Sequence, residues 1–260
     1  MLLSERLAAG EVLFSAWSGV PDTLTTELLA AQGFDAVTLD MQHGAHHEES
    51  VVRCIQPVIA AAKHVLVRIP VGRFDMASRA LDFGAEAVIA PMVNSGEDAR
   101  RFAAAMKYPP LGERSWGPTF GLPRRGGAAK DWLAQSNLRT MAFAMVETRA
   151  AVAALDDILQ TPGIDGIFLG PSDFSIAWSG GSVLNPMLED MLPAVEDVAR
   201  RAKAAGKACA IYIVDPASTG RLASLGFNLF ATGSEGQLIS LGADALLKAA
   251  RTSIGSASQG

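Results

Sequence analysis

Short apolar runs recur along the chain, and most of them end abruptly at a polar or charged residue. Residues 141–145 are apolar and lead to Glu147, and residues 166–169 lead to Asp173, with an alanine-rich helical stretch between. Continuous apolar runs of this length are typical of parallel strands buried on both faces. The two runs predict a β-α-β unit whose carboxylates lie at the same edge of the sheet.

The same pattern continues over the rest of the chain. Further strands are predicted at residues 12–17, 36–40, 65–69, 87–90, 208–213 and 228–231. Helical spacing, a Ser95 cap and a Gly84 stop predict helices near residues 22–32, 48–62, 75–83, 95–106, 187–205, after 215, and 235–250. Eight alternations favour a single-domain (β/α)₈ TIM barrel over an open doubly wound sheet. We assign the barrel to residues 1–252 and a flexible tail to residues 253–260.

One long irregular stretch, residues 107–130, is rich in Pro, Gly and Arg. A loop of this length in a compact domain is usually functional, as a lid or a subunit contact, although a plain surface excursion is the alternative. Trp116, Phe120 and Leu122 would present apolar faces there. We expect Trp116 to form a wall on the side of the substrate acceptor.

The composition narrows the class of protein. The chain has 260 residues, 49% of them hydrophobic, and a formal charge of −5, with a mean hydropathy of +0.23 and a pI near 5.4. The acidic balance argues against nucleic acid as a partner, and no apolar run is long enough to cross a membrane. With no secretory signal evident, we expect a cytoplasmic protein in which Cys54 and Cys209 are buried thiols rather than a disulfide.

Polar residues at the predicted strand ends supply the candidate chemistry. In a barrel of this kind the active site forms at the carboxyl ends of the strands. Glu147 and Asp173 would repel each other in an apolar cavity unless a cation lay between them. We expect them to bind Mg²⁺, Mn²⁺ or Co²⁺, with open positions for the carboxylate and keto oxygens of a 2-oxo acid.

The other strand ends offer a cation and a base. Arg68 could stabilise negative charge that develops on a keto oxygen, and His43 has a pKa suited to moving a proton near neutrality. Asp40 and Asp82 could orient or charge-stabilise the imidazole. For Asp82, a solvated helix acid is an equally good interpretation.

Two further polar stretches receive no catalytic role. His46 and His47 are expected to be surface residues. Residues 233–236, Gly-Ser-Glu-Gly, could form an anion-binding turn, but a simple helix cap before the last helix is favoured.

The positions of the lysines bear on the type of aldol chemistry. An imine-forming aldolase needs a lysine in the barrel mouth. None of the chain's lysines falls at a predicted strand end: Lys63, Lys107, Lys130, Lys203, Lys207 and Lys248. Metal-assisted enolate chemistry is therefore favoured over a Schiff base.

At this point the sequence resembles the HpcH/HpaI aldolase family, the metal-dependent class II pyruvate aldolases. The resemblance runs from Phe34 to about Ala250. It rests on seven segments: Leu39-Asp40-Met41-Gln42-His43, Val67-Arg68, Leu81-Asp82-Phe83-Gly84, Ala90-Pro91-Met92-Val93, Tyr108-Pro109-Pro110-x-Gly112-x-Arg114, Glu147-Thr148-Arg149 and Gly170-Pro171-Ser172-Asp173.

The resemblance implies roles for individual residues. It implies that Glu147 and Asp173 bind the metal, that His43 is the base, that Arg68 stabilises the enolate and that Asp82 raises the basicity of His43.

It also implies how the substrate and the subunits are bound. The backbone around Ser172, from Gly170 through Pro171, would receive the pyruvate carboxylate. Family members are typically hexamers whose last helix packs on a neighbouring subunit.

Two departures place the chain within the family. Hydroxy-oxoheptanedioate aldolases have an acidic residue where this chain has Gln42, and a glutamine where it has Met145. Both positions look more like the subgroup called hydroxy ketoacid aldolases.

The sequence thus predicts a metal-dependent aldolase, a carbon–carbon lyase that reversibly cleaves 4-hydroxy-2-oxo acids into pyruvate, or an analogue such as hydroxypyruvate, and an aldehyde. Its expected partners are those small molecules and further copies of itself, with neither nucleic acid nor membrane. One alternative is a lyase acting on a CoA thioester, for which only Arg124 and Arg125 hint at a phosphate-binding groove. The other is a non-catalytic, metabolite-binding oligomer.

Overall fold

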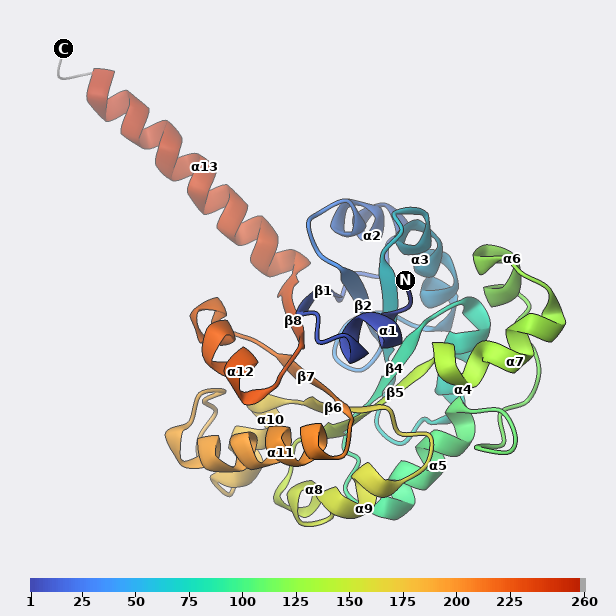
Figure 1. The fold of residues 1–260 in the computed structure, drawn as a ribbon. Coiled ribbons are helices and arrows are strands. Elements are labelled where there is room, and N and C mark those ends of the chain that lie inside the picture. Colours follow the sequence, from blue (N-terminus) through green and yellow to red (C-terminus); the bar gives the residue numbers. More distant parts are fainter. Residues whose placement is uncertain (258–260) are drawn as a thin grey trace.

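Eight parallel strands close into a barrel in the computed structural model, which describes residues 1–257 (Figure 1). Each strand pairs with the next one along the chain, and β8 pairs with β1. The strands are β1 Leu13–Ser18, β2 Ala36–Asp40, β3 His64–Arg68, β4 Ala87–Ala90, β5 Met141–Val146, β6 Gly166–Leu169, β7 Ala208–Tyr212 and β8 Leu229–Ser234. The predicted TIM barrel is confirmed.

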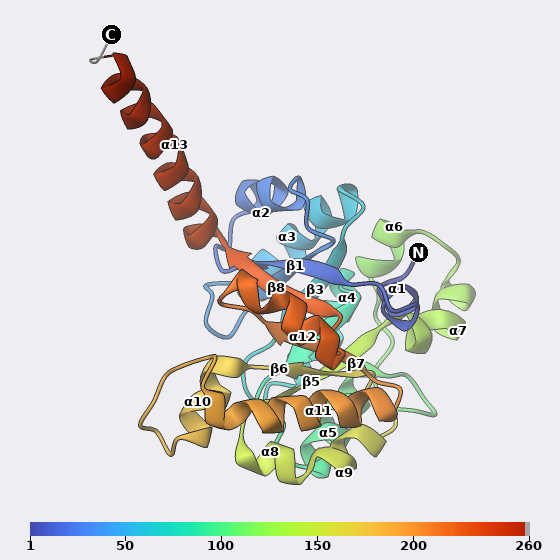
Figure 2. The same ribbon diagram turned by 60° about the vertical axis from the view of Figure 1, so that its left-hand side comes forward.

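The described residues form thirteen α-helices, most of which surround the barrel on its outside (Figures 1 and 2). They are α1 Leu3–Ala8, α2 Thr23–Ala30, α3 Glu48–Ala60, α4 Asp75–Phe83, α5 Gly96–Met106, α6 Gly121–Arg125, α7 Ala129–Arg139, α8 Arg149–Ala153, α9 Leu155–Gln160, α10 Pro171–Trp178, α11 Leu192–Ala204, α12 Thr219–Leu225 and α13 Glu235–Ala257, with 3₁₀ turns η1 Glu189–Met191 and η2 Pro216–Ser218. No helix among residues 1–257 is both long and apolar enough to cross a membrane.

The strands are mostly apolar because both of their faces are buried. On β3, Val65 and Val67 pack outward in the layer beneath the helices, whereas Leu66 packs inside the barrel. Side chains two residues apart share a face of a strand. Arg68 therefore projects inward at the end of β3, and the same period carries β5 from inward-facing Met145 to Glu147.

The helix ends follow the predicted signals in part. Ser95 caps α5 by accepting the backbone N–H of Asp98, and Gly84 ends α4 in the left-handed region at φ 116°. The long irregular stretch, however, contains α6, and its end starts α7. Helices α1, α7 and α10 were not predicted, because each has few apolar residues at helical spacing or follows a strand without a loop.

Helix α13 extends away from the barrel (Figures 1 and 2). It continues beyond the predicted end near residue 250 and into the expected tail, as far as Ala257, while residues 258–260 lie outside the described part of the chain. Five large apolar side chains along it are at least half exposed: Ile239, Leu241, Leu246, Leu247 and Ile254.

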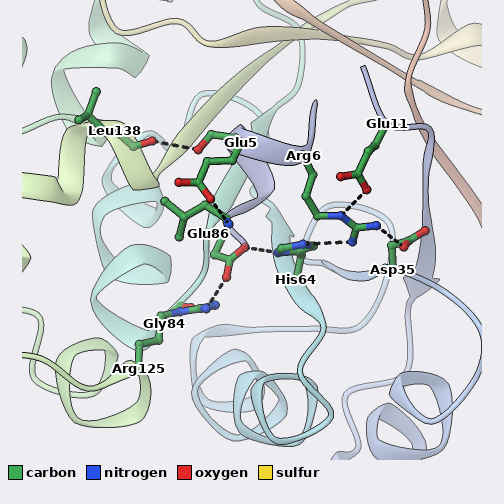
Figure 3. Close-up of polar contacts among 11 residues, drawn as sticks. Glu5, Arg6, Glu11, Asp35, His64, Gly84, Glu86, Arg125 and Leu138 are labelled. Atoms are coloured by element: carbon green, nitrogen blue, oxygen red, sulfur yellow. Dashed lines mark hydrogen bonds and ion pairs between the residues drawn. The ribbon is translucent and has the colours of Figure 1, made fainter. Parts of the chain in front are cut away.

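A polar network lies at the other end of the barrel, where the strands begin (Figure 3). His64, the first residue of β3, contacts Glu86 through Nδ1 at 2.5 Å, and Glu86 also pairs with Arg125. Beside it, Arg6 on α1 pairs with Asp35 at 2.9 Å and approaches the other ring nitrogen of His64. In TIM barrels this end contributes to stability rather than to chemistry.

The two cysteines agree with their prediction. Cys54 and Cys209 are both free and buried. Burial raises the pKa of the Cys209 thiol to about 12, so this side chain behaves as a small apolar group.

Candidate active site

A cavity of about 340 Å³ opens at the carboxyl ends of the strands. It brings together most of the predicted site residues. Its lining consists of Trp17, Gly19, Asp40, His43, Gly44, Arg68, Met145, Phe168, Gly170, Pro171, Ser172, Asp173, Tyr212 and Ser234. The predicted convergence of strand ends is therefore present in this structure.

Glu147 lies against this cavity, directly after β5, and is only 2% exposed. One of its oxygens, Oε1, accepts the backbone N–H of Met92 at 2.7 Å, and Met92 has a positive φ of 54°. Burial raises the pKa of Glu147 to about 7. The nearby Asp173 raises it too, against the opposing effects of Met92 and Arg68.

Gly170 leaves room for the second oxygen of Glu147. A Cβ at this position would lie 2.3 Å from Glu147 Oε2, so only glycine fits beside the carboxylate. In the described chain no donor contacts Oε2. Asp173 follows in the first turn of α10, two residues after Pro171.

These residues fit a divalent cation. Glu147 is buried and resists ionisation, one of its oxygens has no donor, and a second carboxylate lies nearby. A bound cation would stabilise the ionised form of both carboxylates. Within residues 1–257 no group of three or more His, Cys, Asp or Glu side chains could hold a metal ion. A cation held by Glu147 and Asp173 would therefore keep open positions, as catalytic metal sites do.

Asp40 holds Arg68 by a two-pronged ion pair. Arg68 donates from Nε at 2.8 Å and from its terminal nitrogen at 2.6 Å, and its guanidinium also lies 4.8 Å from the centre of the Trp17 ring. Burial by itself would raise the pKa of Asp40, but the hydrogen bonds and charge of Arg68 outweigh it, and the pKa is lowered. Asp40 is therefore ionised and fixes the orientation of the guanidinium.

The same carboxylate also fixes the loop that bears His43. Asp40 accepts the backbone N–H groups of Gln42 at 3.0 Å and of Gly44 at 2.9 Å. Its oxygens contact Arg68, Trp17 and this backbone, so in this structure Asp40 holds the segment that carries His43 and makes no hydrogen bond to the imidazole itself. Within the described chain the His43 imidazole makes no hydrogen bond, and it is exposed at the cavity.

Two other expected site residues lie elsewhere. Asp82, on α4, accepts the Arg114 guanidinium at 2.6 Å, and burial raises its pKa. Trp116 is 48% exposed and packs against Tyr108, with ring centroids 5.7 Å apart. Neither residue lines the cavity or contacts His43 within this chain, because the 107–117 segment is tied to α4.

The expectation that His46 is a surface residue was wrong. His46 is 4% exposed and contacts Ser18 Oγ through Nε2 at 3.0 Å. Ser18 in turn donates to Glu235 at 2.7 Å. No local pattern shows this network, since its members are 28 and 217 residues apart. His47, in contrast, caps α3 at the surface as a polar residue.

Sequence reasoning also missed two aromatic residues that line the cavity. Trp17 is the second-last residue of β1 and Tyr212 the last residue of β7, and the two rings meet edge to face with centroids 5.3 Å apart. Both could have been found from the strand period, because Trp17 and Tyr212 are the last inward positions of their strands.

The stretch at residues 233–236 acts as a cap, the favoured interpretation. Ser234 Oγ accepts the backbone N–H of Gln237 at 3.4 Å. Arg124 and Arg125 both bind acceptors of the protein itself, although Arg124 also borders a cavity of about 740 Å³ away from the candidate active site. Arg124 donates to the carbonyls of Phe83 and Val52, and Arg125 to that of Gly84 and to Glu86.

Comparison with known proteins fits this geometry. The profile of the HpcH/HpaI aldolase/citrate lyase family matches residues 14–241, most of the chain. The chain belongs to this family. The resemblance noted in the sequence and the enzyme class, a carbon–carbon lyase of the aldolase type, are thereby confirmed.

Relatives within the HpcH/HpaI family are similar over nearly the whole length. A hydroxypyruvate/pyruvate aldolase of Roseovarius nubinhibens is 34% identical over 227 residues, which cover 87% of this chain and 88% of the relative. A 4-hydroxy-2-oxo-heptane-1,7-dioate aldolase of Salmonella dublin is 32% identical over 93% of this chain and 91% of the relative. Among solved structures, an HpcH/HpaI aldolase from Desulfitobacterium hafniense DCB-2 has a TM-score of 0.86 at 27% identity, covering 95% and 96% of the two chains.

Proposed function

We propose that this protein cleaves and forms 4-hydroxy-2-oxo acids, with pyruvate or hydroxypyruvate as the nucleophile, in a reaction that depends on a divalent cation. The observation that carries the proposal is the buried carboxylate of Glu147, within reach of the charges of Asp173 and Arg68 and beside the cavity that these two residues and His43 line. Relatives named for pyruvate and hydroxypyruvate support the substrate class.

Each residue of the cavity has a task in this proposal. Glu147 and Asp173 would hold Mg²⁺, Mn²⁺ or Co²⁺, which supplies a Lewis acid for the oxygens of a 2-oxo acid. Arg68, held rigid by Asp40, lowers the free energy of the enolate by placing positive charge at the oxygen where negative charge develops. His43 moves the proton at the carbon next to the keto group. Backbone N–H groups at the start of α10, around Ser172, face the substrate carboxylate.

The acceptor aldehyde would lie against the aromatic wall. Trp17, Phe168 and Tyr212 form one side of the cavity and are in mutual contact through Trp17, with ring centroids 5.3 and 5.8 Å apart. Within this chain these three aromatic residues line the cavity, and Trp116 does not.

Exchange of the pyruvate methyl protons with D₂O tests the proposal without any aldehyde. We expect exchange with Mg²⁺, Mn²⁺ or Co²⁺, its loss in excess chelator, and its restoration by added metal. His43→Ala should slow exchange about 10²- to 10⁴-fold, the usual contribution of a positioned base, and should leave metal affinity unchanged. Full exchange in excess chelator would refute the metal-dependent reaction, and wild-type exchange in the His43 variant would remove this residue from it.

We also propose that α13 packs on a second copy of the chain, within a homo-oligomer such as a hexamer. The helix extends away from its own barrel (Figure 2). Five of its large apolar side chains are exposed. Apolar surface on this scale is typical of a protein–protein contact.

A further inference from the structure

Two glycine-bearing loops form the cavity wall next to His43. Gly19 follows β1 and Gly44 follows β2, and both line the cavity. The loops are in close contact: Ala45 donates its backbone N–H to the Gly19 carbonyl at 2.8 Å, and a Cβ on Gly44 would lie 2.8 Å from Gly19 Cα. A displacement of either loop therefore displaces the other, and His43 with it.

Glu235, the first residue of α13, is directed into the first of these loops. Its carboxylate accepts Ser18 Oγ at 2.7 Å, the Gly19 N–H at 3.0 Å and the Val20 N–H at 3.2 Å. Glu235 is 6% exposed and makes no ion pair with any described residue. This buried carboxylate has no opposite charge beside it and is stabilised by three hydrogen bonds and by the N-terminus of its helix. It therefore binds these donors strongly.

The contact continues from Ser18 into the loop of the base. Ser18 Oγ meets His46 Nε2 at 3.0 Å, and His46 Nδ1 meets Ser50 Oγ, on α3, at 3.2 Å. Because Ser18 donates its proton to Glu235, its oxygen accepts from the imidazole N–H. The segment that bears His43 is thus held at one end by Asp40 and at the other by His46.

We propose that Glu235, Ser18 and His46 are positioning residues for His43, and that α13 acts on the base through Glu235. This inference rests on the proposed function, since it takes His43 as the base. It makes the position of the C-terminal helix a condition for proton transfer, in addition to any role in assembly.

The test combines two substitutions. Glu235→Gln keeps the size of the side chain but places an amide N–H₂ against N–H and O–H donors. We expect methyl exchange of pyruvate to fall at least tenfold in kcat, with KM for pyruvate and metal affinity within about threefold of wild type. In a His43→Ala background the same change should cause no further loss, because the base through which it acts is already absent. If the double variant instead loses activity by the product of the two single-variant factors, the proposal is overturned.

Glu97→Gln is the matched control, since it makes the same change at an exposed first-turn glutamate of α5. It should leave kcat unchanged. Light scattering of both variants separates the effect from a loss of assembly: a Glu235→Gln protein that loses exchange only because it dissociates would contradict a direct action on His43.

Imidazole NMR gives a readout that requires no activity. The chain has four histidines, so single substitutions assign every ring. Glu235→Gln should shift the His43 and His46 signals and leave His64 unchanged. An unmoved His43 signal would overturn the proposal even in a protein that carries out no exchange, whereas failure of wild-type exchange with a shifted signal would count against the proposed function alone.

Discussion

Gly170 shows how the absence of a side chain shapes the site. We expect Gly170→Ala to weaken binding of Mn²⁺ at least tenfold, measured by calorimetric titration. The reason is steric, because the new methyl group would lie 2.3 Å from Glu147 Oε2 and 3.0 Å from Met145 Cε, and the carboxylate has to move. Gly220→Ala on α12 meets nothing within 4 Å and serves as the control. Equal affinity in the two variants would place the metal away from Glu147.

His46 gives the stability of the protein a dependence on pH. Burial lowers its pKa below the usual 6.5, although Glu235 and Asp40 act in the opposite direction. As the pH falls below about 6.5, the unfolded chain takes up a proton that the folded protein still excludes, so the free energy of unfolding decreases. This contribution is lost between pH 6.5 and the lower folded-state pKa.

His46→Gln should therefore make the pH dependence shallower, since glutamine retains an N–H for Ser18 but does not titrate. Urea unfolding between pH 5 and 8 measures the effect. The exposed His47→Gln is the matched control; loss of the α3 cap lowers the free energy of unfolding at every pH, so the curve should be displaced but run parallel to that of wild type. Parallel curves for the His46 variant and the wild type would show that this imidazole titrates equally in both states.

The sequence predicts where a side chain stands better than what it contacts. Arg68 and Glu147 were found because a strand that is apolar on both faces must end at a polar residue, and parallel strands bring these ends together. The partners of Asp40 and His46 could not be found in this way. They depend on residues from β1, β3 and α13, which only the closed barrel brings near.

At the scale of elements, the polar network of His64, Glu86 and Arg125 at the start of the strands allows stability to be tested separately from catalytic activity. Glu86→Gln would remove the charge that pairs with Arg125 and one of the carboxylate oxygens that contact Arg125 and the buried His64. We expect a loss of about 3 kcal/mol in the free energy of unfolding, as for other broken buried pairs, with unchanged exchange activity per folded molecule.

The matched control for this network is Glu49→Gln, which breaks the exposed pair with Arg53 on α3. It should cost less than about 1 kcal/mol, because solvent screens such pairs. Guanidinium denaturation measures both variants. A loss of activity in folded Glu86→Gln protein would mean that the two ends of the barrel are coupled.

The strands and the helices with a capping residue could be predicted from the sequence. The other helices could not, because they lack a regular apolar face. Helix α5 has a serine cap, acidic residues in its first turn and a buried apolar face, and all three signals agree. Helix α7 has only one buried residue, Ser136, so no apolar stripe announces it. Helix α10 begins directly after β6 with Pro171, in a motif that was interpreted as site chemistry rather than as the start of a helix.

For the whole molecule, the exposed apolar side chains of α13 are the feature that a single chain does not cover. Leu246 on this helix is 74% exposed, and placing a charge there should weaken packing on a second copy. We expect Leu246→Lys to reduce the mass in light scattering, while Asp244→Asn, also exposed on α13, should not. An unchanged mass in Leu246→Lys would show that this face of the helix is not part of the contact.

The polar network at the start of the strands also bears on how the enzyme could evolve. It is separated from the cavity by the length of a strand, about 15 Å. Substitutions that far apart, with no shared partners, usually have additive effects on free energy. Mutations that reshape the Trp17 and Tyr212 wall for a different aldehyde could therefore be combined with stabilising changes around Glu86. A directed-evolution library confined to the mouth of the barrel would tolerate more destabilising variants in such a background.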